Sequence, residues 1–299
     1  MSDKVKKIST KKLKKIHAKN KVIKLDMVEI NDFGRPGMKF SNIHFTRSHF
    51  KLLRLKDCEI NNSSFTQSII SDESYLRHAH FENVDFTGTL FKDTNLEKAD
   101  FLDCNMDYVR FENCLLNTDS IIKNSLPQKS NLRLGLLNQL YKNELLSNGN
   151  SGKTDKLLYL IRETERNEIK DILFSPDEYF KKERKNNILR YLTKYLELSF
   201  EKYVCGYGLH IRKIIVTMLF ALLAFALLYY ILAFPSSHCI PTKIKDSLFM
   251  SANSFLMGSL DTNNQEINII TKIIVLIQNG VGILYFALFT SAVYRRIAR

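Results

Sequence analysis

The triplet Gly206-Tyr207-Gly208 is the first stretch of this sequence whose residue types could do chemistry. Two glycines leave the backbone open, so that successive carbonyl oxygens could replace the hydration shell of a cation. Such a carbonyl stack must lie between two membrane-spanning helices, after a short helix that enters the membrane part of the way. Where the triplet stands relative to the apolar segments therefore decides whether it can bind ions.

No other group of residues indicates catalysis. The sequence has no phosphate-binding glycine loop, no Cys or His spacing typical of a metal site, and no Ser, His and Asp that the sequence brings together. We therefore expect no enzymatic activity, no cofactor and no bound metal. The five cysteines do not suggest a set of disulfides.

Two long apolar runs near the C-terminal end could cross a membrane. Residues 214–234 and 273–293 each contain 21 residues and no charge. A helix of this length is about 31 Å long, which matches a hydrocarbon core of about 30 Å. The alternative is a pair of core helices in a soluble protein.

Basic residues flank these runs on their outer sides. Arg212 and Lys213 precede the first run and Arg295, Arg296 and Arg299 follow the second, whereas the segment between them is balanced in charge. This asymmetry predicts a multi-pass protein of the cytoplasmic (inner) membrane, in contact with the lipid bilayer, with both termini in the cytoplasm.

The triplet Gly206-Tyr207-Gly208 then lies on the cytoplasmic side, six residues before the first predicted span. That position excludes it as an ion-selective filter. We expect the two glycines to break a helix, Tyr207 to anchor at the membrane interface, and Arg212 to meet lipid headgroups.

The first half of the chain has a period of five residues. Seventeen positions are all apolar, and nine of them are Phe: 40, 45, 50, 55, 60, 65, 70, then after a one-residue slip 76, 81, 86, 91, 96, 101, 106, 111, 116 and 121. Two residues before these positions the side chain is often small, as at Ser48, Cys58, Ser63, Ser68, Ala79, Cys104 and Cys114. A period of five fits neither an amphipathic helix nor an alternating strand.

The units "ADFLD", "ENVDF" and "TNLEK" resemble the pentapeptide-repeat family over about residues 38–124. The resemblance implies a right-handed quadrilateral β-helix of about four turns, with the apolar and small residues inside and a bulge or loop near 71–75. Residues 1–37 are predicted to be a flexible basic tail, because residues 1–24 hold ten Lys and one Asp.

Residues 125–210 are predicted to be a cytoplasmic helical connector. Residues 148–152, "NGNSG", are the expected joint. A later basic segment has apolar side chains at helical spacing, including Ile188, Leu192 and Leu196. It could lie on the membrane surface, form a seam between subunits, or pack within a soluble helical domain.

The segment 246–261, "DSLFMSANSFLMGSLD", is too short to span a membrane and lies between the two spans. This predicts a re-entrant pore helix. Here the chain resembles bacterial pentapeptide-repeat proteins fused to two-transmembrane, potassium-channel-like domains, over about residues 198–299. The resemblance implies a homotetramer whose second span lines the pore. Candidate lining or hinge residues are Gln278, Asn279, Gly280 and Gly282: the two polar side chains would face the pore or each other, and the two glycines would supply a gating bend or allow close helix packing.

The filter position departs from that family, whose filter reads Thr-Val/Leu-Gly-Tyr-Gly-Asp. This chain has "LMGSLD", with Ser254 in the preceding helix and Met257, Gly258, Ser259 and Asp261 at or near the filter position. Four copies of Asp261 at the outer mouth would favour cations. We therefore predict a pore with weak selectivity among monovalent cations.

The leading hypothesis is a tetrameric, weakly selective cation pore that the cytoplasmic β-helix gates in response to an unidentified ligand or protein. The alternative is a membrane-anchored scaffold or effector with a pore loop that does not conduct. Mimicry of DNA is disfavoured, because residues 71–124 carry a net charge of only −6, and no nucleic-acid partner is expected.

Overall fold

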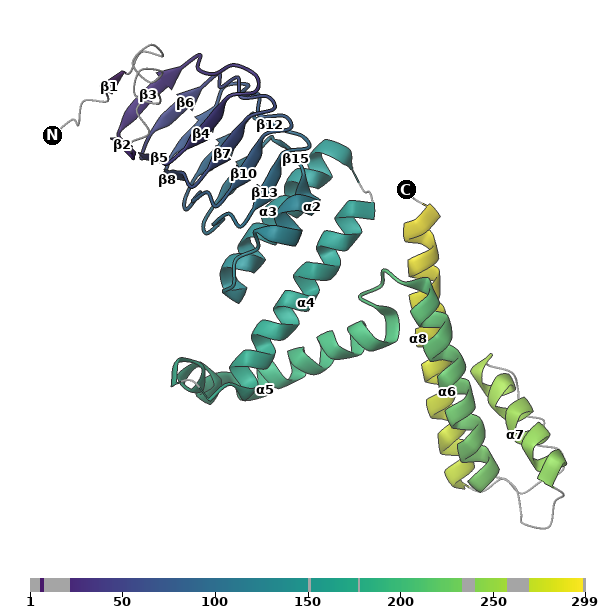
Figure 1. Cartoon of the computed structure of the whole chain (residues 1–299). Coiled ribbons are helices and arrows are strands. Elements are labelled where there is room, and N and C mark those ends of the chain that lie inside the picture. The colour runs from purple at the N-terminus through teal and green to yellow at the C-terminus, as the bar shows by residue number, and fades with distance from the viewer. Residues whose placement is uncertain are drawn as a thin grey trace. The chain divides into compact units, whose positions relative to one another are not determined.

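The computed structural model describes residues 6–7, 22–149, 152–176, 178–232, 240–256 and 269–297. The chain divides into two compact units, which we name the solenoid unit (Met1–Phe180) and the C-terminal unit (Lys181–Arg299). Figure 1 shows stacked strands in the first unit and helices alone in the second.

The solenoid is built from short parallel strands that form four sheets, one for each side of the coil. The first sheet contains β1 (Lys6–Lys7), β3 (Val28–Asn31), β6 (His49–Lys51), β9 (Ile69–Ser71), β11 (Leu90–Lys92) and β14 (Arg110–Glu112). The second contains β4 (Lys39–Ser41), β7 (Glu59–Asn61), β10 (His80–Glu82) and β13 (Asp100–Leu102). The third contains β2 (Ile23–Asp26), β5 (Ile43–Thr46) and β8 (Ser64–Thr66), and the fourth β12 (Asn95–Leu96) and β15 (Leu115–Leu116).

The strand register confirms four five-residue units per turn. Phe40 pairs with Ile60, twenty residues later. Across the predicted slip the step becomes 21 residues, since Ile60 pairs with Phe81. The extra residue is absorbed at one corner, where Asp72 and Glu73 both have positive φ angles of 57° and 58°.

Nearly every unit turns its corner through a residue in the left-handed region. Among the described residues this conformation recurs every five positions, for example at Asn42, Arg47 and Leu52, with φ angles of 57°, 50° and 53°. A side chain in this region costs on the order of 1 kcal/mol. The cost recurs at each corner, so backbone pairing between coils and the apolar interior must offset it.

The interior consists of the residues that carry the five-residue period. Phe45, Phe65 and Phe86 stack from coil to coil, with ring centroids 5.5 and 5.7 Å apart. Phe81 stacks on Phe101 at 5.1 Å. All are buried, so the prediction that the periodic apolar residues point inward is confirmed.

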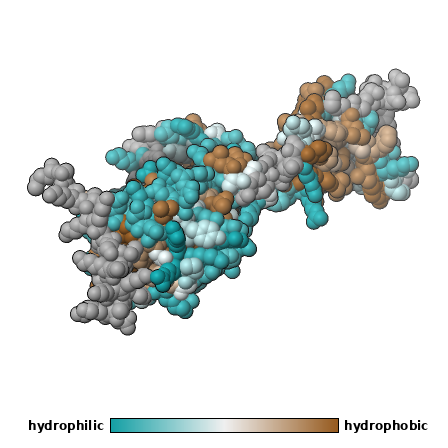
Figure 2. Space-filling view, turned by 90° about the horizontal axis from the view of Figure 1, so that it is seen from above, coloured by the Kyte–Doolittle hydropathy of each residue, from teal (hydrophilic) through white to brown (hydrophobic). Residues whose placement is uncertain are grey.

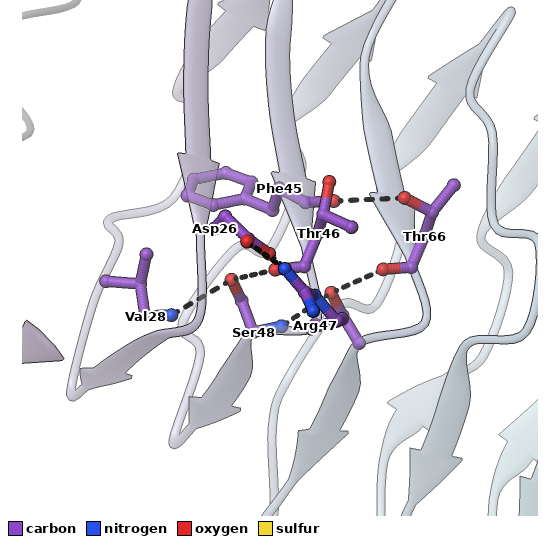
Figure 3. Close-up of polar contacts among 8 residues, drawn as sticks. Asp26, Val28, Phe45, Thr46, Arg47, Ser48 and Thr66 are labelled. Carbon is purple, nitrogen blue, oxygen red and sulfur yellow. Dashed lines mark hydrogen bonds and ion pairs between the residues drawn. The ribbon is translucent and has the colours of Figure 1, made fainter. Parts of the chain in front are cut away.

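The small residues also point inward, where they bind the backbone of the neighbouring coil. The N–H of Val28 donates to the hydroxyl of Ser48 at 3.3 Å, and the N–H of Ser48 donates to that of Ser68 at 3.1 Å (Figure 3). On the outer surface the guanidinium of Arg47 pairs with the Asp26 carboxylate (Figure 3). Small polar side chains thus take part in the pairing between coils.

The solenoid begins earlier than predicted. Strands β2 and β3 form a coil below β5 and β6, with Ile23 opposite Ile43 and Ile30 opposite Phe50. The prediction that all of residues 1–37 form a tail is therefore wrong for residues 23–37. The solenoid has about five turns, not four.

The solenoid also ends earlier in strand form. The last predicted repeat position, Ile121, is fully buried but belongs to α2 (Thr118–Asn124) rather than to a coil. Helices α3 (Ser130–Asn148) and α4 (Gly152–Phe174) follow, and the joint predicted at residues 148–152 falls where α3 ends and α4 begins. Leu137, Leu140 and Leu157 share one hydrophobic core with the coils. This part of the predicted connector therefore belongs to the solenoid unit.

Helices α2 and α3 close the open end of the solenoid with side chains. The N–H groups of Phe101 and Cys104 donate to the hydroxyls of Ser120 and Ser125, at 2.8 and 3.2 Å. The N–H of Phe111 donates to Gln139 at 3.1 Å. The Asn143 amide accepts from the N–H of Cys114 at 3.0 Å and donates to its carbonyl at 2.6 Å. These side chains replace the next coil, so this sheet edge does not stay open.

Beyond α4, most of the described residues are helical. Helix α5 (Glu178–Phe200) runs into the π-helix η1 (Glu201–Cys205), followed by α6 (Ile211–Leu232), α7 (Ile240–Phe255) and α8 (Ile269–Ile297). The boundary between the two units falls within α5, whose backbone leaves helical geometry at Asn187.

Helix α6 covers the predicted span 214–234 as far as Leu232, and α8 contains the predicted span 273–293; both helices are long and apolar enough to cross a membrane. Only 17% of each apolar segment is buried within the protomer, whereas a soluble core helix would be covered. Figure 2 shows hydrophobic colour over these helices and hydrophilic colour over much of the solenoid.

Candidate functional site

A buried hydrogen-bond network joins the three helices α6, α7 and α8. The Tyr229 hydroxyl of α6 donates to Oε1 of Gln278 on α8 at 2.7 Å. The amide nitrogen of Gln278 donates to the carbonyl and to the hydroxyl of Ser251 on α7, both at 2.9 Å. The Ser251 hydroxyl donates in turn to the Leu222 carbonyl of α6 at 2.8 Å. Tyr229 and Gln278 are fully buried, so one glutamine side chain links all three helices.

A second polar contact lies one residue further along α8. The Asn279 amide nitrogen donates to the carbonyl of Ser254 on α7 at 2.5 Å and to the carbonyl of Val275 at 3.3 Å. The acceptors are both carbonyls, which fixes the orientation of the amide. Asn279 therefore holds the last turn of α7 against α8.

The closest approach between α7 and α8 is at Gly282. A Cβ atom added there would stand 2.4 Å from the carbonyl oxygen of Phe255, so no side chain fits without moving α7. Gly280, two residues earlier, has no atom within 4 Å of such a Cβ. Of these two glycines, only Gly282 is required by packing within the protomer.

The start of α7 is held at the end of α6. The Lys243 ammonium lies 4.7 Å from the centroid of the Tyr230 ring, a distance at which a cation is attracted to an aromatic face. With 16 residues, α7 is about 24 Å long. It is attached at both ends and is shorter than a membrane span.

The predicted site residues lie in different environments. Gln278 was predicted to face a pore or Asn279; its side chain is fully buried inside the protomer, where it contacts α6 and α7. The hydrogen bonds of Gln278 to Tyr229 and Ser251 direct its side chain into the protomer instead. Asn279 contacts α7, whereas Gly280 is exposed on the uncovered face of α8. Ser254 is buried on α7. Met257, Gly258, Ser259 and Asp261 lie outside the described residues.

The helix break predicted at Gly206-Tyr207-Gly208 is present. All three residues have left-handed backbone conformations, with φ angles of 56°, 60° and 71°. Tyr207 is buried, so it is not free to anchor at a membrane surface as predicted. Arg212 is exposed at the start of α6, as contact with headgroups requires.

This corner is fixed by packing against α6 and α8. The buried Cys205 packs with Ile214 of α6 and Ala292 of α8. The Thr217 hydroxyl donates to the Val204 carbonyl at 3.0 Å. Burial raises the pKa of the Cys205 thiol above its ordinary value, as expected for a structural rather than a reactive cysteine. The end of η1 is thus attached to α6 and α8 together.

Tyr229 and Ser251, two residues of the network, were not predicted from the sequence. Tyr229 stands within an apolar run where nothing marks it as a partner of Gln278. Ser247, Ser251 and Ser254 carried a usable signal, because their spacing of four and three residues places them on one helix face. That polar stripe indicates the face of α7 that packs against the spans.

These observations define a class of protein: a β-solenoid with four five-residue units per coil, capped by helices and followed by two helices long enough to cross a membrane. Residues 40–90 and 73–117 match two family models, both described as pentapeptide repeats, with nine and eight copies. The N-terminal region therefore contains pentapeptide repeats.

Among the solved structures that match is the crystal structure of a pentapeptide repeat protein (Rfr23) from the cyanobacterium Cyanothece 51142. The match has 14% sequence identity and a TM-score of 0.18, and it covers 31% of this chain and 62% of that chain. No curated protein matches this chain.

Proposed function

We propose that the C-terminal unit forms a membrane pore, in which α6 and α8 span the bilayer and α7 is a re-entrant pore helix. The observation that carries this proposal is the position of the end of α7 beside Gly282. Gly282 is nine residues past the start of the predicted second span, or about 14 Å into a core of about 30 Å. Helix α7 therefore ends near the middle of the bilayer.

A helix end at that depth needs a particular environment. Its last carbonyls have no partner in the helix, and non-helical backbone at this depth is tolerated only inside protein or beside water. Leu256, directly after α7, is 66% exposed in the protomer. Assembly of several copies around a water-filled axis would supply the environment that one protomer lacks, and we propose a homotetramer.

The uncovered face of α8 would line the pore. Gln278 and Gly282 face α7, so the available face carries Leu276, Ile277, Gly280, Ile283, Leu284 and Ala287. This lining is apolar, and apolar constrictions control flow by excluding water. Selectivity would then rest on the outer mouth, where four copies of Asp261 would favour cations over anions, with weak selectivity among monovalent cations.

The full-length protein reconstituted into bilayers tests the proposal by single-channel recording. In a gradient of KCl, we expect currents that reverse near the equilibrium potential of K⁺. With K⁺ on one side and Na⁺ on the other, we expect the currents to reverse near zero. Asp261→Asn should reduce the preference for cations over chloride. A strong preference of the wild type for anions would rule out this role of Asp261, and absence of current from inserted tetramers would rule out the pore.

A matched pair of variants tests the role of α7. Gly282→Leu should abolish the current, because its side chain must displace the end of α7. Gly280→Leu, in the same span, has open space around it within the protomer and should leave the tetramer assembled. If both variants assemble and conduct like the wild type, α7 is not the pore helix.

The second candidate is a membrane-anchored scaffold. It is favoured by a groove of about 1040 Å³ on the solenoid unit, between the corner at the slip and the end of α3. The groove is lined by Lys51, Asp72, Glu73, Tyr75 and Asp93, among others. A detergent-stable monomer without conductance would support this candidate and exclude the tetrameric pore.

A further inference from the structure

Helix α5 leaves a row of large apolar side chains uncovered. Their exposed fractions are 52% for Ile188, 75% for Leu189, 41% for Leu192, 58% for Leu196 and 58% for Phe200. Exposure on this scale in consecutive turns is unusual for a soluble surface, because large apolar patches mark interaction sites. We name these five residues the α5 stripe.

The α5 stripe lies on one side of the helix. At 100° per residue, its five members fall within an arc of about 120°, the width of a surface-seeking apolar face. Arg190, Lys194 and Glu197 lie on the opposite side, and all three are exposed. The two sides of α5 therefore differ in chemistry but not in access, which provides a matched comparison within one helix.

The charge around the stripe favours an anionic partner. Residues 181–213 contain nine Lys or Arg and three Asp or Glu, a net charge of +6. Basic residues near the cytoplasmic leaflet are attracted to its anionic lipids. A second copy of this chain would bring the same positive charge to the contact.

The chain also continues from the stripe into the membrane. Helix α5 leads through η1 and the corner at residues 206–208 to α6, within eleven residues of Phe200. The corner is held by Cys205 against Ile214 and by Thr217 against Val204. The stripe therefore ends eleven residues before α6, the proposed first span. The surface of the bilayer would lie close to that end of the stripe.

We propose that the α5 stripe binds the cytoplasmic surface of the bilayer, with its apolar side chains between anionic lipid headgroups. The proposal rests on membrane insertion of α6 and α8, as in the proposed function, but not on ion conduction. It would hold the segment that joins the solenoid unit to the spans in the plane of the membrane. Forces on the solenoid would then reach α6 through η1.

Fluorescence quenching by lipids tests this in the full-length protein. The described cysteines are buried, and Cys239 is changed to Ser in every variant. Single cysteines are introduced as L189C, L192C and L196C on the stripe, and as R190C, K194C and E197C on the other side. Each is labelled with a small environment-sensitive fluorophore and reconstituted in vesicles with about one third phosphatidylglycerol and with brominated acyl chains.

We expect quenching on the stripe to exceed that on the opposite side by about twofold or more, because only the stripe enters the acyl boundary. The difference should shrink in vesicles of phosphatidylcholine alone. V216C, on an exposed position of α6, reports membrane insertion in the same vesicles. Quenching at V216C with equal or no quenching on both sides of α5 would overturn this proposal alone.

Other outcomes separate the alternatives. Spin labels at positions 189 and 196 that pair between copies at short distance, without lipid quenching, would assign the stripe to a second copy of the chain and overturn the proposal. Loss of quenching at V216C would overturn both insertion and the lipid contact. A quenched stripe in a protein that carries no current would support the lipid contact while contradicting the pore.

Discussion

Buried polar groups have different arrangements in the two units. In the solenoid, Ser48 and Ser68 belong to a series in which each hydroxyl accepts an N–H from the coil before it. In the C-terminal unit, Gln278 forms hydrogen bonds with both Tyr229 of α6 and Ser251 of α7. The solenoid repeats one contact many times, whereas the C-terminal unit relies on a contact made once.

The difference has consequences for how each unit responds to damage. Stacked repeats contact mainly their neighbours, so the loss of one contact in the middle stays local. The end of the stack has no neighbour and depends on α2 and α3. The C-terminal unit resembles the capped end of the solenoid, because its polar contacts do not repeat and each joins more than one partner.

The largest effect is expected at the cap, with Asn143→Ala. This change leaves the N–H and the carbonyl of Cys114 without their partner, and both are buried. At about 1–3 kcal/mol for each of these two unsatisfied buried groups, the free energy of unfolding should fall by about 2–6 kcal/mol. The urea midpoint of the full-length protein, followed by circular dichroism, measures this.

Asn138→Ala is the matched control on the same helix. Asn138 donates only to the Leu134 carbonyl of its own helix, so its loss should cost much less. Equal effects of the two changes would show that α3 stabilises the solenoid by packing alone and not by closing the sheet edge.

The next effect is expected at Gln278→Leu, which removes the contact common to the three helices. The Tyr229 hydroxyl and the Ser251 carbonyl lose their partner, but hydrogen bonds between membrane helices are worth only about 0.6–1.7 kcal/mol each. We expect a loss of about 1–2 kcal/mol in resistance to denaturing detergent. Tyr229→Phe and the double variant complete a cycle that isolates the coupling of the pair.

Thr290→Val serves as the control in the same helix, because Thr290 is exposed and donates to its own helix at Phe286. If Gln278→Leu behaves like this control, the network does not hold α7 in place. The comparison between the two units would then lose its basis.

How far the sequence predicts the structure follows the same division. The period of five identified Phe45, Phe65 and Phe86 as interior residues and located the slip at residues 71–75. It failed at the first coil because Arg35 interrupts the period, although Ile30 and Leu25 continue it further back. A repeated contact leaves a repeated signal, which one irregular unit can hide.

Single contacts leave little signal. Asn143 is one of several polar residues on α3, and no spacing marks it as a partner of Cys114. Gln278 was singled out because it is polar in an apolar run, but its direction depends on Tyr229 and Ser251, which are far away in the chain. Tertiary packing decides which way the Gln278 side chain points, and the sequence carries no signal of that packing. The sequence alone therefore indicated a side chain that faces a pore or Asn279.

A smaller effect is expected for one contact within the stack, at Ser68→Ala. The Ser68 hydroxyl accepts the N–H of Ser48 at 3.1 Å and donates to the Thr66 carbonyl at 3.2 Å. Neighbouring coils keep the backbone pairing on both sides, so the loss should be about 0.5–1.5 kcal/mol. A cost as large as that of Asn143→Ala, measured by the same urea midpoints, would contradict the local response expected of a repeat.

The smallest effect concerns an ion pair between α2 and α4, where the Lys156 ammonium donates to Asp119 at 2.6 Å. This hydrogen bond lowers the pKa of the Asp119 carboxyl below its ordinary value. A lowered pKa in the folded state stabilises the fold above the unfolded pKa of about 3.9, and the stabilisation is lost as pH falls through the folded value. Both side chains are about half exposed, so the pair is worth less than about 1 kcal/mol.

Lys156→Met should therefore lower the urea midpoint slightly at pH 7, and the difference from the wild type should vanish as the pH falls through the lowered pKa of Asp119. Lys142→Met, at an exposed position of α3, is the control and should show no such dependence on pH. A difference for Lys156→Met that persists unchanged at low pH would assign its effect to packing of the lysine stem. In that case α4 would be held on the solenoid by its apolar face alone, through Leu157 and Ile161.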